Sequence, residues 1–167
     1  MRWACLAGLL AACGTSSEPP PTPDVFLAFS SSFADFRSWN FFHSDGPPAG
    51  TQPDPVLGPR SQYINTIPPT GSTEFPVGTI IVEVRENGTN QILAGVKRGG
   101  DYNATGAINW EWFELTENPV TIAWRGVGPP AGETYGGDPN GGCNSCHAAC
   151  GADNDYVCSA HLQLSGF

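Results

Sequence analysis

The stretch TIIVEVRENGTNQILAGVKR, residues 79–98, carries the strongest structural signal in the chain. On both sides of its central Asn87-Gly88, apolar residues alternate with other residues, at Ile80, Val82, Val84, Ile92, Ala94 and Val96. Such alternation is typical of a strand with one buried face, and Asn-Gly is the pair that tight hairpin turns favour most. The stretch therefore predicts an antiparallel β-hairpin.

Similar short runs lie on either side of this hairpin, separated by turn signals. The strand-like runs are residues 62–67, 79–86, 92–98, 110–115 and 120–124. Their length and spacing predict an antiparallel sheet of four to five strands. Residues 25–42 have apolar side chains at a loose helical spacing, which predicts one N-terminal helix. The expected fold class is α+β, with a loop over the Pro-, Gly- and Asp-rich residues 42–59.

Near the C-terminus, Cys143-Asn144-Ser145-Cys146-His147 has the C-x-x-C-H pattern of covalent haem attachment. In this pattern the two thiols bond to the haem vinyl groups and the adjacent imidazole binds the iron. We therefore expect one haem c per chain, held by Cys143 and Cys146, with His147 as the proximal ligand. The Gly- and Pro-rich residues 126–142 before the motif suit a loop that closes over a cofactor.

The second axial position of the iron has no obvious ligand in the sequence. The only methionine is Met1, so the usual Met/His pairing of electron-transfer cytochromes is not available. His43 and His161 remain as alternatives, but no local pattern positions either ring. We expect the distal face of the haem to be open.

Two further cysteines follow the motif. Because the chain reads as exported, Cys150 and Cys158 form an even pair in an oxidising compartment, which favours a disulfide. The alternative is structural zinc, because four thiols and a histidine lie between Cys143 and Cys158.

The N-terminus predicts export. Met1-Arg2 is positive, residues 3–10 are apolar, and Leu10-Ala11-Ala12-Cys13 resembles the lipobox of bacterial lipoproteins. We expect a signal peptide over 1–12, lipid on Cys13, a flexible tether over 13–24 and one domain over 25–167. The expected location is the periplasm, with a lipid anchor in the outer membrane. A plain signal peptide with an incidental cysteine is the alternative, and the apolar run is too short to span a membrane.

The charge balance limits the partners. Sixteen acidic residues against seven basic ones give a formal net charge of −9 at pH 7. Such a chain repels nucleic acid and has no basic patch for anionic lipid, so nucleic-acid binding is not expected. An acidic surface is suited to guide a basic redox partner.

Several blocks together resemble the cytochrome P-460 family. In chain order they are Phe36-Arg37-Ser38-Trp39, Phe75-Pro76-Val77-Gly78-Thr79, Val96-Lys97, Asn109-Trp110-Glu111-Trp112, the haem motif and Asp155-Tyr156-Val157. The resemblance implies a mostly antiparallel sheet with helices, frequently a homodimer, and one haem with a proximal histidine and a vacant distal face. The family includes hydroxylamine-oxidising enzymes and the cytochromes c′-beta, which bind nitric oxide.

The chain departs from the hydroxylamine-oxidising members at two positions. Their haem-linked lysine corresponds here to Glu83, and their distal carboxylate falls near Leu93. The only lysine, Lys97, matches a different family position. The resemblance therefore implies no cross-link and an apolar distal wall, which favours the binding of neutral gases.

Glu83 itself is the candidate catalytic carboxylate. A three-residue hairpin loop would place it directly opposite Leu93, whereas a two-residue loop would put the two on opposite faces. The alternative is an exposed strand residue, because Ile80, Val82 and Val84 already define a buried face.

These observations lead to three functional hypotheses. The first is binding or redox conversion of small nitrogen oxides, such as nitric oxide or hydroxylamine, at an open haem. The second is a periplasmic electron-transfer cytochrome. The third is a module without haem, in which the cysteines bind zinc or form disulfides.

Overall fold

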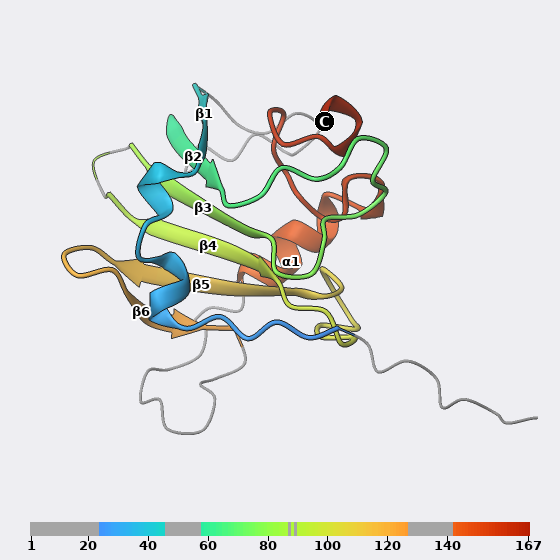
Figure 1. Ribbon diagram of the computed structural model, residues 1–167, viewed down its shortest axis with the longest axis horizontal. Helices are drawn as coiled ribbons and strands as arrows, with labels where there is room; N and C mark the ends of the chain where they lie inside the picture. The colour runs from blue at the N-terminus through green and yellow to red at the C-terminus, as the bar shows by residue number, and fades with distance from the viewer. Residues whose placement is uncertain (1–23, 46–57, 87, 89, 127–141) are drawn as a thin grey trace, which may run out of the picture.

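The computed structural model describes residues 24–45, 58–86, 88, 90–126 and 142–167, and its centre is one antiparallel sheet (Figure 1). The sheet contains six strands in chain order among these residues: β1 (Asn40–Ser44), β2 (Arg60–Ile64), β3 (Ile80–Arg85), β4 (Ile92–Lys97), β5 (Trp110–Thr116) and β6 (Thr121–Arg125). The expected α+β class and antiparallel sheet are confirmed, but the predicted number of strands was too low.

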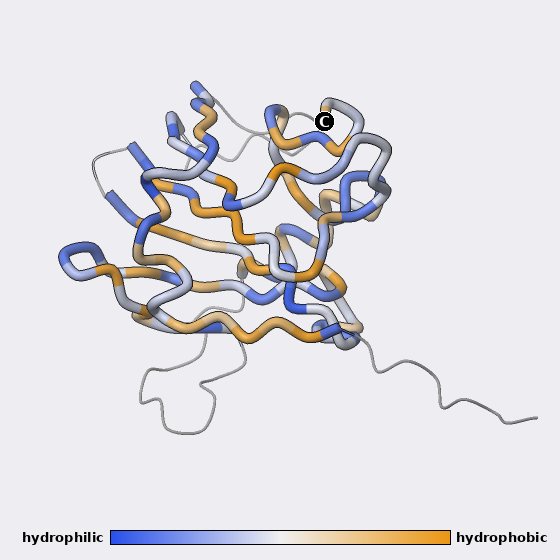
Figure 2. The backbone as a smooth tube through the Cα atoms, in the orientation of Figure 1, coloured by the Kyte–Doolittle hydropathy of each residue, from blue (hydrophilic) through white to orange (hydrophobic). Residues whose placement is uncertain are grey.

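The hairpin predicted over residues 79–98 is present as β3 and β4. Glu83 pairs directly with Leu93, so the register is the one expected for a three-residue loop. Hydrophobic residues concentrate in the strands, whereas connections such as the turn between β5 and β6 are hydrophilic (Figure 2).

The predicted N-terminal helix over 25–42 is wrong. The segment contains two 3₁₀ helices, η1 (Ser30–Phe33) and η2 (Phe36–Ser38), and then β1, the strand that sequence reasoning missed. Serine side chains compete with helical hydrogen bonding here. The Ser32 hydroxyl accepts a hydrogen bond from the Phe29 amide at 3.1 Å, and the Ser38 hydroxyl donates one to the Asp35 carbonyl at 2.7 Å.

The two faces of the sheet pack against different parts of the chain. The core face carries Val82, Val84 and Phe113 and is covered by the N-terminal segment, whose Phe33 and Phe36 are buried against it. The helix face carries Glu83, Leu93 and the indoles of β5, and the C-terminal segment covers part of it. That segment comprises α1 (Gly142–Ala149), η3 (Ala152–Asn154) and η4 (Leu164–Gly166).

Several predicted features lie outside the described residues. They are the signal peptide, Cys13, all but the last residue of the tether, and most of the 42–59 and 126–142 loops. Within the described ranges, no helix is both long and apolar enough to cross a membrane.

Candidate functional site

The residues of the haem-attachment motif lie on helix α1, against the helix face of the sheet. Cys143, Cys146 and His147 have the i, i+3 and i+4 spacing that places side chains on one side of a helix. Neither Cys143 nor Cys146 is in a disulfide; Cys143 is partly buried against the apolar cluster of this face, and Cys146 is exposed. The two thiols and the imidazole therefore lie on one side of the helix, with Cys143 and His147 against the sheet and Cys146 exposed.

The His147 ring is held on two sides. It stacks on the Trp112 indole with ring centroids 3.9 Å apart, and its Nδ1 lies 2.8 Å from the Tyr156 carbonyl oxygen. A carbonyl can only accept a hydrogen bond, so Nδ1 carries the proton and the lone pair is on Nε2. Burial lowers the pKa of His147 to about 4, against the opposing effect of the Tyr156 hydrogen bond. The imidazole is therefore neutral near pH 7, with Nε2 as the nitrogen able to bind a metal ion.

A tight turn after α1 aims the Tyr156 carbonyl at the histidine. Asp155 and Tyr156 both have left-handed backbone conformations, with φ of 48° and 63°. The Tyr156 amide donates to the Gly151 carbonyl at 3.0 Å, which closes the turn. His147 thus donates its hydrogen bond to a backbone carbonyl, so no side-chain pattern in the sequence could have revealed this partner.

Cys150 and Cys158, the pair predicted to form a disulfide, are joined by one in the structure. The disulfide links the residue after α1 to the segment that follows the turn at Asp155 and Tyr156. Cys158 Sγ lies 3.7 Å from His147 Nδ1. In the described part of the chain, no three His, Cys, Asp or Glu residues are grouped so as to hold a metal ion. The donor set for the zinc alternative is therefore not assembled.

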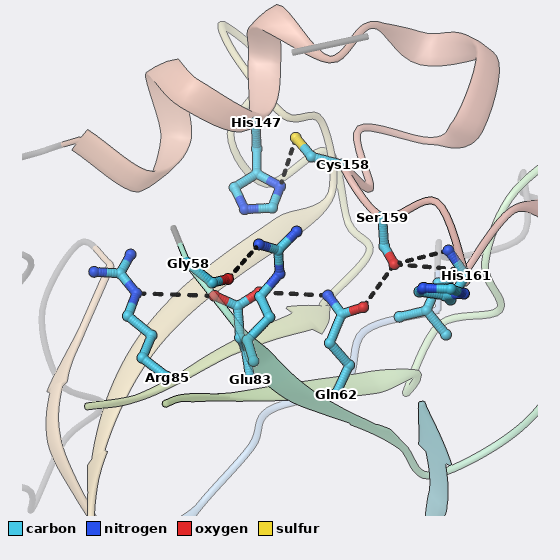
Figure 3. Close-up of polar contacts among 10 residues, drawn as sticks. Gly58, Gln62, Glu83, Arg85, His147, Cys158, Ser159 and His161 are labelled. Atoms are coloured by element: carbon cyan, nitrogen blue, oxygen red, sulfur yellow. Dashed lines mark hydrogen bonds and ion pairs between the residues drawn. The ribbon is translucent and has the colours of Figure 1, made fainter. Parts of the chain in front are cut away.

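Glu83 is the centre of a polar cluster on the helix face. Its carboxylate oxygens lie 3.1 Å from Arg60 Nε and 3.8 Å from Arg85 Nε, and it accepts a hydrogen bond from Gln62 Nε2 at 3.3 Å. Figure 3 shows His147 reaching from α1 toward the strands that carry these residues. We call Glu83, Arg60, Gln62 and Arg85 the Glu83 cluster.

Two expectations about this surface were wrong. The Glu83 side chain is 21% exposed and lies on the helix face, so it is not an ordinary exposed strand residue. Nor is the wall around Leu93 apolar, because Glu83 and Glu114 pair with Leu93 on its two sides. Strand alternation explains both results: Val82 and Val84 point to the core face, which leaves Glu83 and Leu93 together on the other.

The environment of Glu83 raises its affinity for a proton. Burial raises the pKa of this carboxyl, and the attraction of Arg60 and Arg85 and the Gln62 hydrogen bond oppose the increase. A carboxylate with a raised pKa is a stronger proton acceptor than an ordinary surface glutamate. Sequence reasoning missed Arg60 and Gln62, which are buried side chains on the strand that pairs with β3.

The other two histidines lie on different parts of the structure. His43 pairs with Ser61, which pairs with Val84, so His43 belongs to the core face. Its Nε2 lies 2.9 Å from Asp45 Oδ1. His161 is exposed, and its backbone amide bonds to the Ser159 hydroxyl. His43 therefore lies on the face opposite Glu83, whereas His161 belongs to the C-terminal segment, next to the hydrogen bond between Ser159 and Gln62.

The chemistry of these residues fits a covalently bound haem. Two thiols outside any disulfide share a helix side with an imidazole whose Nε2 is available, as thioether bonding and iron ligation require. Beside that imidazole, the Trp112 indole nitrogen is buried and has no hydrogen-bond partner among the described residues. Ile81, Leu93 and Trp124 on the same face are only partly buried, which leaves apolar surface for a planar group.

Comparison with known proteins identified no relative of the chain. No family model matches the chain, and no match was found among curated proteins or solved structures. The resemblance to the cytochrome P-460 family therefore stays a prediction based on the sequence blocks.

Proposed function

We propose that the chain is an exported c-type haem protein that binds or redox-converts small nitrogen oxides. Cys143 and Cys146 would hold the haem, and His147 Nε2 would be the proximal iron ligand. The observation that carries this proposal is the hydrogen bond between His147 Nδ1 and the Tyr156 carbonyl, on a helix that also carries both thiols. Histidines that bind metal ions typically make such a bond with the other ring nitrogen.

A bound haem would supply an iron centre that binds small ligands and exchanges electrons. The chain would orient the iron-binding imidazole and set the charges around it. Trp112 covers one face of the proximal ring, and the Tyr156 carbonyl fixes its tautomer. The chain has no methionine besides Met1, and His43 lies on the opposite face of the sheet; both observations support an open site for nitric oxide or hydroxylamine.

The Glu83 cluster supports a ligand that forms hydrogen bonds. The expected preference for neutral gases depended on an apolar wall, and the surface around Leu93 is instead a mixture of carboxylates, guanidinium groups and apolar side chains. Glu83 would accept a proton from a ligand such as hydroxylamine, and Gln62 and Arg60 hold its carboxylate in place. Nitric oxide needs no proton transfer in order to bind.

A lysine–haem cross-link is not part of this proposal. Lys97, the only lysine, is 2% exposed, and its ammonium lies 2.6 Å from both Asp155 carboxylate oxygens. An ammonium held in this way does not reach a haem edge without breaking a buried ion pair.

The test is haem attachment. The full chain is produced with the haem-attachment machinery, and its intact mass and pyridine haemochrome spectrum are measured. We expect one covalent haem in the unmodified chain, little stable haemoprotein in Cys143→Ala or Cys146→Ala, and unchanged attachment in the control Ser145→Ala. Haem that both cysteine variants retain after acid-acetone extraction would overturn the proposal. A six-coordinate spectrum in both oxidation states would favour the electron-carrier alternative.

A further inference from the structure

A buried ion pair connects the sheet to the turn that holds His147. Lys97 Nζ, at the end of β4, lies 2.6 Å from each carboxylate oxygen of Asp155. Asp155 also accepts a hydrogen bond from the Phe75 amide at 2.9 Å, so its carboxylate is fixed from two directions. Lys97 and Asp155 are only 2% and 6% exposed. Two charges this deeply buried are tolerated because they satisfy each other.

The ion pair is one residue away from the contact that orients the histidine. Asp155 precedes Tyr156, and both have the left-handed backbone conformation that non-glycine residues rarely adopt. Such a conformation persists where surrounding contacts impose it. Here the contacts are the Lys97 ammonium and the Phe75 amide on Asp155, and the Gly151 carbonyl on Tyr156.

We propose that Lys97 is a positioning residue for His147. Through Asp155 it fixes the turn whose Tyr156 carbonyl accepts the His147 Nδ1 proton, and this selects the tautomer with Nε2 available to bind iron. The proposal rests on the proposed function only for the role of the iron, because the tautomer is a property of the chain itself. A proximal imidazole with a carbonyl partner is also a stronger electron donor, so Lys97 indirectly tunes the iron.

A purely structural role for Lys97 is the rival explanation, and the chain offers a matched control. Glu111 and Arg125 form a second buried ion pair, both 0% exposed, with Arg125 Nη2 2.5 Å from Glu111 Oε2. This pair lies on the core face, since Glu111 pairs with Val96 of the apolar core. Breaking it removes a comparable interaction without touching the turn at Asp155.

The experiment compares Lys97→Met, Lys97→Arg and Glu111→Gln in the full chain, with the Cys150–Cys158 disulfide intact. In haem-loaded protein, resonance Raman of the ferrous state gives the iron–histidine stretching frequency, which falls when the hydrogen bond at Nδ1 is lost. We expect a lower frequency and a higher midpoint potential in Lys97→Met, substantial recovery in Lys97→Arg, and no change in Glu111→Gln. An unchanged frequency in folded Lys97→Met overturns the proposal.

Two further arms keep the test decisive. If Lys97→Met does not fold, Asp155→Asn, which keeps an acceptor for the Phe75 amide, is expected to shift the frequency in the same direction by less. An unchanged value in folded Asp155→Asn would refute the inference. If the purified chain carries no haem, the proposed function has failed. Nitrogen-15 NMR of the His147 ring then tests Lys97 alone, with Nδ1–H expected in the unmodified chain and mixed tautomers in Lys97→Met.

Discussion

The two faces of the sheet differ in how completely their polar groups are paired and their side chains are packed. On the core face, Phe33 packs on Phe113 with ring centroids 5.3 Å apart, and the buried Glu111–Arg125 pair is completed by a bond from Arg125 to the Ala28 carbonyl. On the helix face, the Trp112 indole N–H has no partner among the described residues, and Glu83 is only partly covered.

This difference supports the proposal that the function resides on the helix face. Unsatisfied buried polar groups cost free energy and are rare in parts of a protein that serve stability alone. The core face has the complementary packing of a stabilising core. The helix face combines a neutral imidazole, a carboxyl with a raised pKa and a buried indole N–H without an acceptor among the described residues. These are the groups that the proposed ligand site would use.

The largest expected effect is a difference in the unfolding free energy that is lost when a side chain is truncated on each face. Phe113→Ala on the core face should cost about 3–5 kcal/mol of unfolding free energy, because it empties a fully buried site. Leu93→Ala, on the partly exposed helix face, should cost clearly less. Denaturant unfolding of both variants without haem checks this. Equal costs would mean that the helix face is an ordinary core.

The second effect concerns activity. Glu83→Gln keeps the shape of the side chain but removes the proton acceptor, so hydroxylamine oxidation with an artificial electron acceptor should fall about 100-fold or more. Nitric oxide binding should change little. The control is Glu86→Gln, which removes a more exposed carboxylate next to β3. Brisk turnover by Glu83→Gln would show that another group accepts the proton.

The third effect is the contribution of the disulfide beside the imidazole. Replacing Cys150 and Cys158 with Ser should destabilise the chain by roughly 2 to 3 kcal/mol, because the bridge restricts the unfolded state. Thermal unfolding with and without reductant measures the difference. Free thiols at both positions in periplasmic material would contradict the pairing.

The smallest expected effect is a pH dependence from Glu83. A carboxyl whose pKa is raised on folding contributes stability that is fully present below its ordinary pKa of 4.5 and is lost as the pH rises through the folded value. Stability of the chain should therefore decline over that interval, and Glu83→Gln should remove this component. Identical pH profiles for the two proteins would contradict the raised pKa.

The sequence predicted those parts of the fold and the site whose signals are local. The alternation around Asn87-Gly88 gave the hairpin, and the adjacent residues of the C-x-x-C-H motif indicated His147. The prediction of an N-terminal helix was wrong for two reasons. Phe33 and Phe36, three residues apart, fit a 3₁₀ turn as well as an α-helix, and the Ser32 hydroxyl accepts a hydrogen bond from the backbone amide of Phe29.

The rest of the site depends on contacts between distant segments. Arg60 meets Glu83 only because β2 pairs with β3, and the Tyr156 carbonyl reaches His147 only through a turn in left-handed conformation. Lys97 and Asp155 are separated by 58 residues. No periodicity in the sequence signals such pairs.

The central claim is that His147 binds the iron of a covalent haem whose other face is open. Its most direct test is the absorption spectrum of the ferrous protein, matured with the haem-attachment machinery, before and after addition of nitric oxide. The account predicts a five-coordinate c-type haem spectrum that changes on binding of nitric oxide. A colourless protein, or a six-coordinate ferrous spectrum that nitric oxide leaves unchanged, would contradict it.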